Sequence, residues 1–163
     1  LVPSCTFTLR DLVGKNNPGG PKVKHFSQVI AENVSALSLK YPHPAKVTYH
    51  DPCQLVRYMG IVEEPRTILK AIQGIDFVEP EWTKREWATC CGGGGGVIAI
   101  KEADPIRYAA FELKIDQMKK VGAKTVVMSC SNCRLQFTDC VQHFNLDVKV
   151  RGLSEMVADA LVD

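Results

Sequence analysis

The sequence has 163 residues, of which 45% are hydrophobic and 23% charged, with a formal net charge of +2. These proportions are those of a globular domain and exclude a disordered chain. Basic residues do not cluster among aromatics as in nucleic-acid-binding proteins, and no apolar run reaches the roughly 18 residues of a membrane span. Without a secretion signal, we expect a cytoplasmic protein. Because the sequence opens on Leu1 rather than methionine, we also expect an excised or processed piece.

Strand and helix signals alternate along the first half of the chain. Residues 1–12 indicate the end of a strand running into a helix, and residues 14–21 indicate a loop because of their Gly, Pro and Asn content. A short strand at about Val23 then leads into a helix with Ser27 as a possible cap. Its apolar residues recur every three or four positions, at Phe26, Val29, Ile30, Val34 and Leu37.

The second half shows clearer boundaries. Pro65 opens a helix over residues 64–73. Another helix is predicted with Asp104 as its N-cap and Pro105 at its first helical position, and it ends at Gly122. We expect Ala109 and Leu113 on the apolar side of that second helix. The expected strands are residues 46–49, 75–78, 86–89, 125–128 and 148–150. The remaining helices are expected at residues 131–143 and 154–161.

This alternation predicts an α/β fold, a Rossmann-like three-layer unit with a mostly parallel sheet. In such sheets, sites form beyond the carboxyl ends of the strands. Cys53, Cys90 and Cys130 each follow a predicted strand closely. Three separate segments should therefore deliver thiols to the same edge of the sheet.

Five of the seven cysteines form the pattern C-x36-C-C-x38-C-x2-C, at Cys53, Cys90, Cys91, Cys130 and Cys133. Seven cysteines are compatible with disulfides, inert core thiols or metal ligands. A chain of this size and compartment does not need disulfides, and this spacing favours a metal or cluster site. Five thiols exceed the four ligands of an ordinary zinc site, which makes an iron–sulfur cluster the better fit.

The remaining two cysteines lie outside this pattern. Cys140 sits seven residues after Cys133 on one face of a predicted helix, so we expect it in the core. Cys5 is either a former ligand or simply buried.

Five glycines, residues 92–96, follow the Cys90–Cys91 pair. Gly92 and Gly93 are expected to bring backbone N–H groups close to the thiolates, where hydrogen bonds raise a reduction potential. The run lacks the Gly-Lys-Ser/Thr of a phosphate loop, so nucleotide binding is not expected.

Other polar and aromatic side chains surround the cysteine motif. His50 is a candidate proton donor near the site, or alternatively a strand-end histidine bonded to the backbone. Asp51 either caps the turn before Pro52 or takes part in catalysis. Arg66 should pair with Glu63 or Asp51. Trp82 and Trp87 either shield the site or only pack.

The chain also contains an internal repeat. Residues 22–32 resemble residues 149–159 position by position, and Val2–Cys5 then falls opposite Cys130–Cys133 with a one-residue difference in spacing. Duplication explains this more simply than similar geometry arising twice. We therefore expect residues 1–21 to be the tail and linker of a preceding, degenerate copy. Residues 22–163 would be one complete unit.

The cysteine pattern, with His50-Asp51-Pro52-Cys53, Glu64-Pro65-Arg66 and Gly122-Ala123, resembles the CCG or cysteine-rich domain of heterodisulfide reductase catalytic subunits. It is similar also to iron–sulfur subunits of glycolate and lactate oxidases, and to a subunit of the membrane complex linked to sulfite reduction. The similarity spans about residues 22–163, with a second gap slightly longer than usual for the family.

The resemblance implies a noncubane [4Fe-4S] cluster, with a conventional [4Fe-4S] cluster or zinc as alternatives. Its ligands would be Cys53, Cys90, Cys91, Cys130 and Cys133. Cys53, Cys90, Cys91 and His50 are the residues expected in catalysis.

The implied function is thiol/disulfide redox chemistry in an electron-transfer complex, cytoplasmic or peripheral on a membrane. The cubane ferredoxin spacing is absent from the sequence, so electrons would come from a ferredoxin-like or flavin subunit or domain. The implied substrate is a disulfide or thiol, including one on a small carrier protein. Two alternatives stay open: a structural zinc module, and an electron relay in a 2-hydroxy-acid oxidase.

Overall fold

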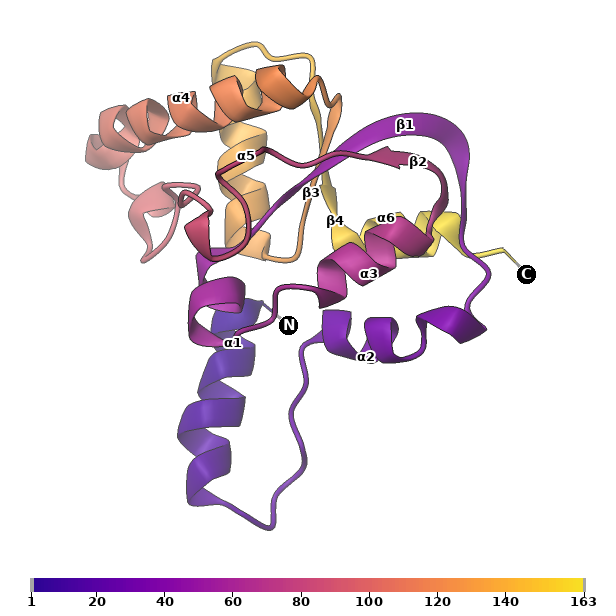
Figure 1. Ribbon diagram of the computed structural model, residues 1–163. Coiled ribbons are helices and arrows are strands. Elements are labelled where there is room, and N and C mark those ends of the chain that lie inside the picture. Colours follow the sequence, from indigo (N-terminus) through magenta and orange to yellow (C-terminus); the bar gives the residue numbers. More distant parts are fainter. Residues whose placement is uncertain (1, 163) are drawn as a thin grey trace.

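The computed structural model describes residues 2–162, and a four-stranded parallel sheet forms its centre (Figure 1). The strand order is β2-β1-β3-β4, with β1 spanning Lys40–His50, β2 Gln73–Phe77, β3 Thr125–Met128 and β4 Lys149–Gly152. All three ladders are parallel, so each crossover between neighbours runs through helical segments. The predicted α/β fold with a mostly parallel sheet is confirmed.

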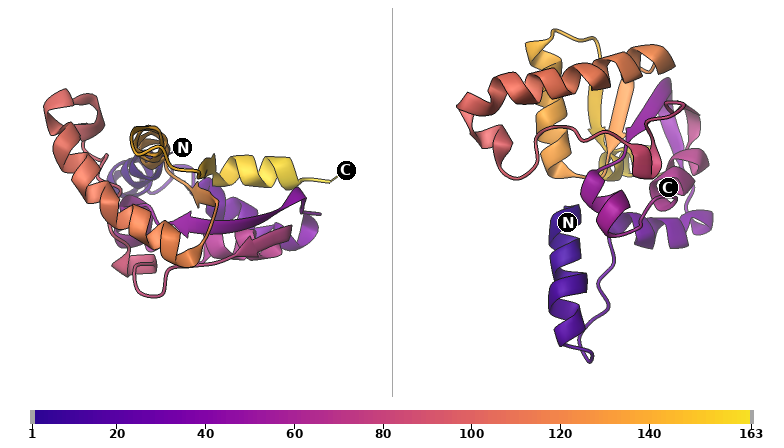
Figure 2. Two further views of the ribbon diagram at one scale, coloured as in Figure 1. Left: turned by 90° about the horizontal axis from the view of Figure 1, so that it is seen from above. Right: turned by 60° about the vertical axis from the view of Figure 1, so that its left-hand side comes forward.

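Helices cover both faces of this sheet (Figure 2). Helices α4 (Asp104–Val121) and α5 (Ser131–His143) pack against one face, which presents Val126 and Met128. Helices α2 (Phe26–Glu32), α3 (Glu64–Ala71) and α6 (Leu153–Ala160) pack against the other, which presents Val127. Successive residues of β3 thus face opposite cores, which explains why the strand is apolar throughout.

The N-terminal residues form a helical arm that projects from the rest of the chain (Figure 1). Helix α1 (Pro3–Phe7) continues through a π-helical turn at Thr8–Val13 and a 3₁₀ turn at Gly14–Asn16. Phe7 meets Tyr58 edge to face, with ring centroids 5.7 Å apart. The arm therefore contacts the domain beside the helical turn Gln54–Tyr58, directly after Cys53.

The best-signalled elements begin and end where the sequence predicts. Helix α4, strand β3 and helix α5 match residues 104–121, 125–128 and 131–143. Gly122 ends α4 in the left-handed conformation, with φ of 65°. The other predicted helices and strands also occur, with boundaries shifted by one to six residues, except for those at residues 1–2, 22–23 and 86–89.

Those strand predictions were wrong. No strand occurs at Val2 or Val23 in the described part of the chain, and Leu1 lies outside it. Residues 85–87 form a 3₁₀ turn instead of a strand. Arg57 donates hydrogen bonds to the carbonyls of Glu86 (3.2 Å) and Ala88 (2.7 Å), so a side chain takes the acceptors that a ladder would use. Further 3₁₀ turns of the same length lie at Val34–Ala36, Val97–Ala99 and Lys101–Ala103.

Two predicted helix caps were also wrong. His25, not Ser27, caps α2, because its ring nitrogen accepts a hydrogen bond from the Ser27 N–H. Asp104 is the first residue of α4 rather than its cap, and its carboxylate binds Arg107.

The expected apolar side of α4 was assigned to the wrong residues. Leu113 is 57% exposed, whereas Phe111, Ile115 and Met118 face the core. These three follow the i, i+4, i+7 spacing of one helical stripe. The charged residues Arg107 and Lys114 lie on the same stripe and are buried.

Candidate metal centre

The five motif cysteines meet at the carboxyl edge of the sheet. Cys53 follows β1, Cys90 and Cys91 lie on the glycine loop, Cys130 follows β3, and Cys133 lies in the first turn of α5. Parallel strands end at the same edge, so these distant segments converge. All seven cysteines of the chain are free thiols.

Contacts among these thiols link them into one group. The Sγ atoms of Cys91 and Cys133 lie 3.4 Å apart in the interior. Cys53 and Cys91 both lower the pKa of Cys90, and Cys133 lowers that of Cys130, so each remaining thiol neighbours another member of the group. The order of neighbours is therefore Cys53–Cys90–Cys91–Cys133–Cys130.

Burial is uneven across this group. Cys91 and Cys133 are buried, Cys53 and Cys130 are half-buried, and Cys90 is exposed. Beside Cys130, a groove of about 360 Å³ includes Ser131, Arg134 and Ser154 in its lining. The group is closed on its inner side and open toward Cys90 and Cys130.

Neighbouring groups lower the pKa of some of these thiols and raise the pKa of others. Hydrogen bonds from Cys53, Cys91 and the Gly92 N–H lower the pKa of Cys90 far below its usual value. The hydrogen bond from Cys133, assisted by backbone N–H groups, lowers the pKa of Cys130 to about 6. The donors Cys53 and Cys133 have raised pKa values because their protons are held by these neighbours. Cys90 and Cys130 are therefore thiolates at neutral pH, the form that binds metals.

The glycine loop fits tightly around the thiols. Gly92 has φ of 87°, and its N–H lies 3.4 Å from the Cys90 sulfur. A Cβ on Gly93 would lie 2.7 Å from the Gln136 Cβ, so only glycine fits there. The structure thus places backbone donors at the cysteines, as expected for Gly92 and Gly93.

His50 lies at the inner side of the group. Its ring packs on Phe137, and a ring nitrogen lies within 4.8 Å of the sulfurs of both Cys91 and Cys133. Both ring nitrogens are buried and find no hydrogen-bond partner among the described residues. The alternative that His50 bonds to the backbone was therefore wrong. Burial, followed by the nearby Lys114, lowers the pKa of His50, so the ring is neutral.

Lys114 is a residue that the sequence analysis missed. It is 4% exposed, and its ammonium donates to Gln117 at 3.1 Å. Gln117 in turn donates to Thr89, the residue before Cys90. A cavity of about 20 Å³ borders both His50 and Lys114, enough for about one water molecule. Burial lowers the pKa of Lys114 to about 8 although the thiols and Asp51 oppose this.

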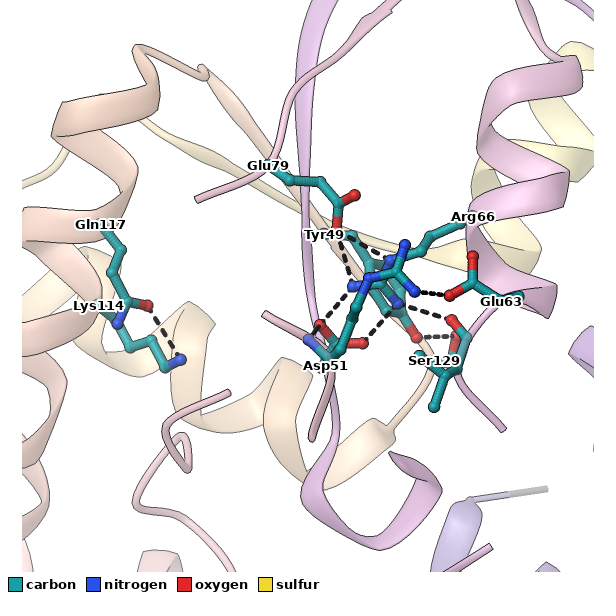
Figure 3. A network of polar contacts seen from close by, with 10 residues as sticks. Tyr49, Asp51, Glu63, Arg66, Glu79, Lys114, Gln117 and Ser129 are labelled. Atoms are coloured by element: carbon teal, nitrogen blue, oxygen red, sulfur yellow. Dashed lines mark hydrogen bonds and ion pairs between the residues drawn. The ribbon is translucent and has the colours of Figure 1, made fainter. Parts of the chain in front are cut away.

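A buried ion-pair network holds the strand end that carries the motif (Figure 3). Arg66 binds both carboxylate oxygens of Asp51, at 2.9 and 2.7 Å, and also Glu79. The backbone N–H of Arg85 donates to Asp51 at 2.7 Å. Asp51 therefore ties β1 and α3 to the segment leading to Cys90, rather than capping the turn before Pro52. The predicted Arg66–Asp51 pair is confirmed, while Glu63 pairs with Arg85 instead.

The structure also decides the placement of the two other cysteines and the two tryptophans. Cys140 is fully buried and accepts a hydrogen bond from Gln136, which confirms its assignment to the core. Cys5 is exposed, so the alternative of a buried Cys5 was wrong. Trp82 and Trp87 are 78% and 74% exposed, and neither is buried over the thiols.

Among the helices of the described chain, none combines the length and apolarity needed to cross a bilayer.

A known family model matches the part of the chain that carries these thiols. The model of the cysteine-rich domain, CCG, matches residues 47–138 and so includes all five motif cysteines. The chain belongs to this family. The CCG domain places its cysteine pairs on the glycine loop and at the start of α5.

Several curated proteins are similar over most of the chain. A component of the dihydromethanophenazine:CoB–CoM heterodisulfide reductase of Methanosarcina barkeri is 34% identical over 92% of the chain. A component of the fumarate reductase (CoM/CoB) of Methanothermobacter marburgensis is 36% identical over 86%. The Hdr-like menaquinol oxidoreductase iron–sulfur subunit of Archaeoglobus profundus is 35% identical over 72%. The matched regions make up 36%, 28% and 22% of these relatives, so the chain spans about a third of their length or less.

Proposed function

We propose that this CCG domain binds an iron–sulfur cluster and serves an oxidoreductase that acts on a disulfide or thiol. The observation that carries the proposal is the linked group of five thiols, buried at Cys91 and Cys133 and open at Cys90. Soft thiolates of this number suit an iron–sulfur cluster. The relatives' names, a heterodisulfide reductase and an iron–sulfur subunit, support both parts of the proposal.

The donor set fits such a group. Cys53, Cys90, Cys91, Cys130 and Cys133 would hold it, in the noncubane [4Fe-4S] form or a conventional one. Two of the five are already thiolates, and binding would displace the protons of the others. When bound, the cluster would supply electrons one at a time to the disulfide.

Reduction of a disulfide consumes two electrons and two protons, breaks one S–S bond and yields two thiols. Residues of this chain would shape that chemistry from two sides. The exposed Cys90 edge leaves room for the substrate's sulfur atoms, and the groove beside Cys130 offers Arg134 and two serine hydroxyls to a polar substrate. His50, neutral and with a ring nitrogen within 4.8 Å of both buried sulfurs, would donate a hydrogen bond there.

Electrons would come from a ferredoxin-like or flavin subunit or domain, placing this chain in a cytoplasmic or peripheral complex. One relative is named an EtfAB:quinone oxidoreductase, which favours a second candidate function, electron relay alone. A structural zinc site is the third reading. It is favoured by His50, Cys91 and Cys133, whose ligand atoms lie within 4.8 Å of one another.

A turnover experiment with the full-length protein separates these functions. Reduced viologen would be the anaerobic electron donor, and the heterodisulfide named for the Methanosarcina relative the first probe. We expect two viologens oxidised and two thiols formed per disulfide, with Cys90→Ala inactive and the core variant Cys140→Ala active. An iron-containing protein that forms no thiol with this or simple alkyl disulfides would contradict the disulfide chemistry and favour relay.

A further inference from the structure

Three polar atoms beside the candidate metal centre are buried and have no hydrogen-bond partner among the described residues. They are the hydroxyl oxygen of Thr48 and both ring nitrogens of His50. Thr48 and His50 are 4% and 5% exposed, and they stand two residues apart on β1, so their side chains point to the same face of the sheet. Buried polar groups in folded proteins are nearly always hydrogen-bonded, so these atoms call for a partner.

Lys114 of α4 brings a positive charge to the same face. The β3 residues paired with this part of β1, Val126 and Met128, belong to the core beneath α4 and α5, and Lys114 is buried on the stripe of α4 that faces this core. An ammonium group has three N–H donors. In the described part of the chain its acceptor is Gln117, at 3.1 Å, which takes one of them (Figure 3). Two donors of a buried cation are therefore free for another acceptor.

Thr48, His50 and Lys114 line one and the same cavity, of about 20 Å³. That volume holds about one water molecule, and a buried water needs two to four polar partners, which these three side chains supply. A groove of about 590 Å³ lies next to this cavity on the surface and shares three lining residues with it: Pro80, Thr83 and Gln117. Water can therefore reach the cavity from this groove.

The ammonium of Lys114 determines how such a water is oriented. Beside a fixed positive charge, a water turns its oxygen toward the N–H donor and its two hydrogens away from it. Those hydrogens can be accepted by the Thr48 hydroxyl oxygen and by a ring nitrogen of His50. Burial keeps the His50 ring neutral, so the nitrogen that accepts is bare and the other nitrogen carries the hydrogen.

We propose that Lys114 is a positioning residue that acts through one bound water to set the tautomer of His50, so that the ring N–H faces the sulfurs of Cys91 and Cys133. A ring nitrogen of His50 lies within 4.8 Å of both sulfurs. An N–H directed at a thiolate stabilises its negative charge and raises the reduction potential of a bound cluster. The effect on the potential rests on the function proposed above, whereas the bound water and the tautomer do not.

A high-resolution crystal structure of the full-length protein tests the first part of this proposal. We expect one ordered water at roughly 2.7–3.2 Å from the Lys114 Nζ, the Thr48 Oγ1 and one ring nitrogen of His50. The other ring nitrogen should face the two sulfurs. A dry cavity, or a water whose neighbours do not include the Lys114 ammonium, would overturn the proposal.

The tautomer is measured by NMR of metal-free full-length protein labelled with ¹⁵N-histidine, at pH 7, below the pKa of about 8 of Lys114. Long-range correlations distinguish the protonated ring nitrogen from the bare one.

His50 should show one tautomer by more than about tenfold, and Lys114→Met should reduce this preference by roughly tenfold, because it removes the charge that orients the water. Lys119→Met, on the exposed side of the same helix, should keep the wild-type ratio. A side chain that only fills space would leave the tautomer unchanged, so an unaltered ratio in Lys114→Met would overturn the proposal. Because neither measurement needs a cluster, a protein without iron would refute the proposed function but not this inference.

Discussion

The sulfurs of Cys91 and Cys133 lie 3.4 Å apart in the interior, although 42 residues separate them in the chain. One comes from a glycine loop and the other from the first turn of α5. A third buried thiol, Cys140, lies seven residues further along α5 but outside the linked group. This difference defines a test of which thiols hold the metal.

The affinity for the bound metal should fall by more than about tenfold in Cys91→Ala and in Cys133→Ala. Even partners that only support metal ligands contribute about 10- to 100-fold, and a lost ligand costs more. Cys140→Ala should retain wild-type metal content. Metal analysis of anaerobically purified full-length variants checks this. Equal loss in Cys140→Ala would indicate that the effect comes from core packing.

In the metal-free protein, the two thiols Cys130 and Cys140 should differ in their rate of alkylation. Cys130, with a pKa of about 6, should react with iodoacetamide at a rate that is nearly constant above pH 7, because it is already a thiolate. Cys140, buried and with a pKa of about 12, should stay unmodified on the same timescale. Peptide mass spectrometry after timed labelling measures both. A Cys130 rate that still rises tenfold from pH 7 to pH 8 would refute the assignment.

The buried Lys114 should lower the free energy of unfolding of the metal-free protein. Its pKa is about 8 when folded, below the 10.5 of an unperturbed lysine, so the unfolded chain binds more protons between those values. The free energy of unfolding of the wild type should therefore rise with pH from about 8 to 10.5. Lys114→Met should remove this rise and stabilise the metal-free domain by roughly 1–3 kcal/mol at pH 7. Urea titrations at pH 7 and 10 measure it.

In the metal-loaded protein the same variant has a second readout. Removing a buried cation near the thiols should lower the reduction potential, because the positive charge favours the electron-rich state. Lys119→Met, on the exposed side of α4, is the control and should leave the potential unchanged. An unchanged potential in Lys114→Met would show that this lysine has no electrostatic role at the site.

The Asp51–Arg66 pair should contribute strongly to stability. Asp51→Asn leaves a buried guanidinium with only Glu79 as its charged partner, and loss of one member of a buried pair typically costs about 3–5 kcal/mol. Asp147→Asn breaks the exposed Lys124–Asp147 pair and should leave the stability close to that of the wild type. Chemical denaturation compares the two. Similar small losses in both variants would contradict the role given to Asp51.

Two adjacent glycines provide a matched test of the loop. Gly93→Ala places a methyl group 2.7 Å from the Gln136 Cβ and should destabilise the domain by about 1–3 kcal/mol. Gly94→Ala meets nothing within 4 Å and should be close to neutral. The unfolding midpoints of the two variants decide. If Gly94→Ala is the more damaging, the close approach to Gln136 does not determine the loop.

Local signals made part of this fold predictable. Pro105 near the start of α4, Gly122 after it and the apolar run of β3 each fix a boundary by short-range chemistry, and the cysteine spacing identifies the metal-centre candidates. Burial of charged side chains was not predictable in this way. Lys114 looks like an ordinary surface residue in sequence, and only the fold shows that it is buried and donates to Gln117. The sequence predicts a partner for Arg66 but does not show that the pair is buried.

The surroundings of His50 were not predictable either, because the fold leaves its ring without the polar contacts that the sequence suggested. Its place three residues before Cys53 suggested a position at the site, but only the packing on Phe137 shows that the ring lacks a polar partner. The arm is a third case. The sequence predicts a helix there, and only the structure shows that Leu9, Leu12 and Val13 are exposed.

The measurement closest to the central claim is the iron, sulfide and zinc content of anaerobically purified full-length protein, with an EPR spectrum of its oxidised state. The account predicts iron and acid-labile sulfide in equal amounts, about four of each for this domain if the cluster is of the [4Fe-4S] type. The oxidised protein should be paramagnetic, and that signal should be lost in Cys91→Ala. One zinc per domain with no iron or sulfide would contradict the proposed redox function and make the five thiols a structural site.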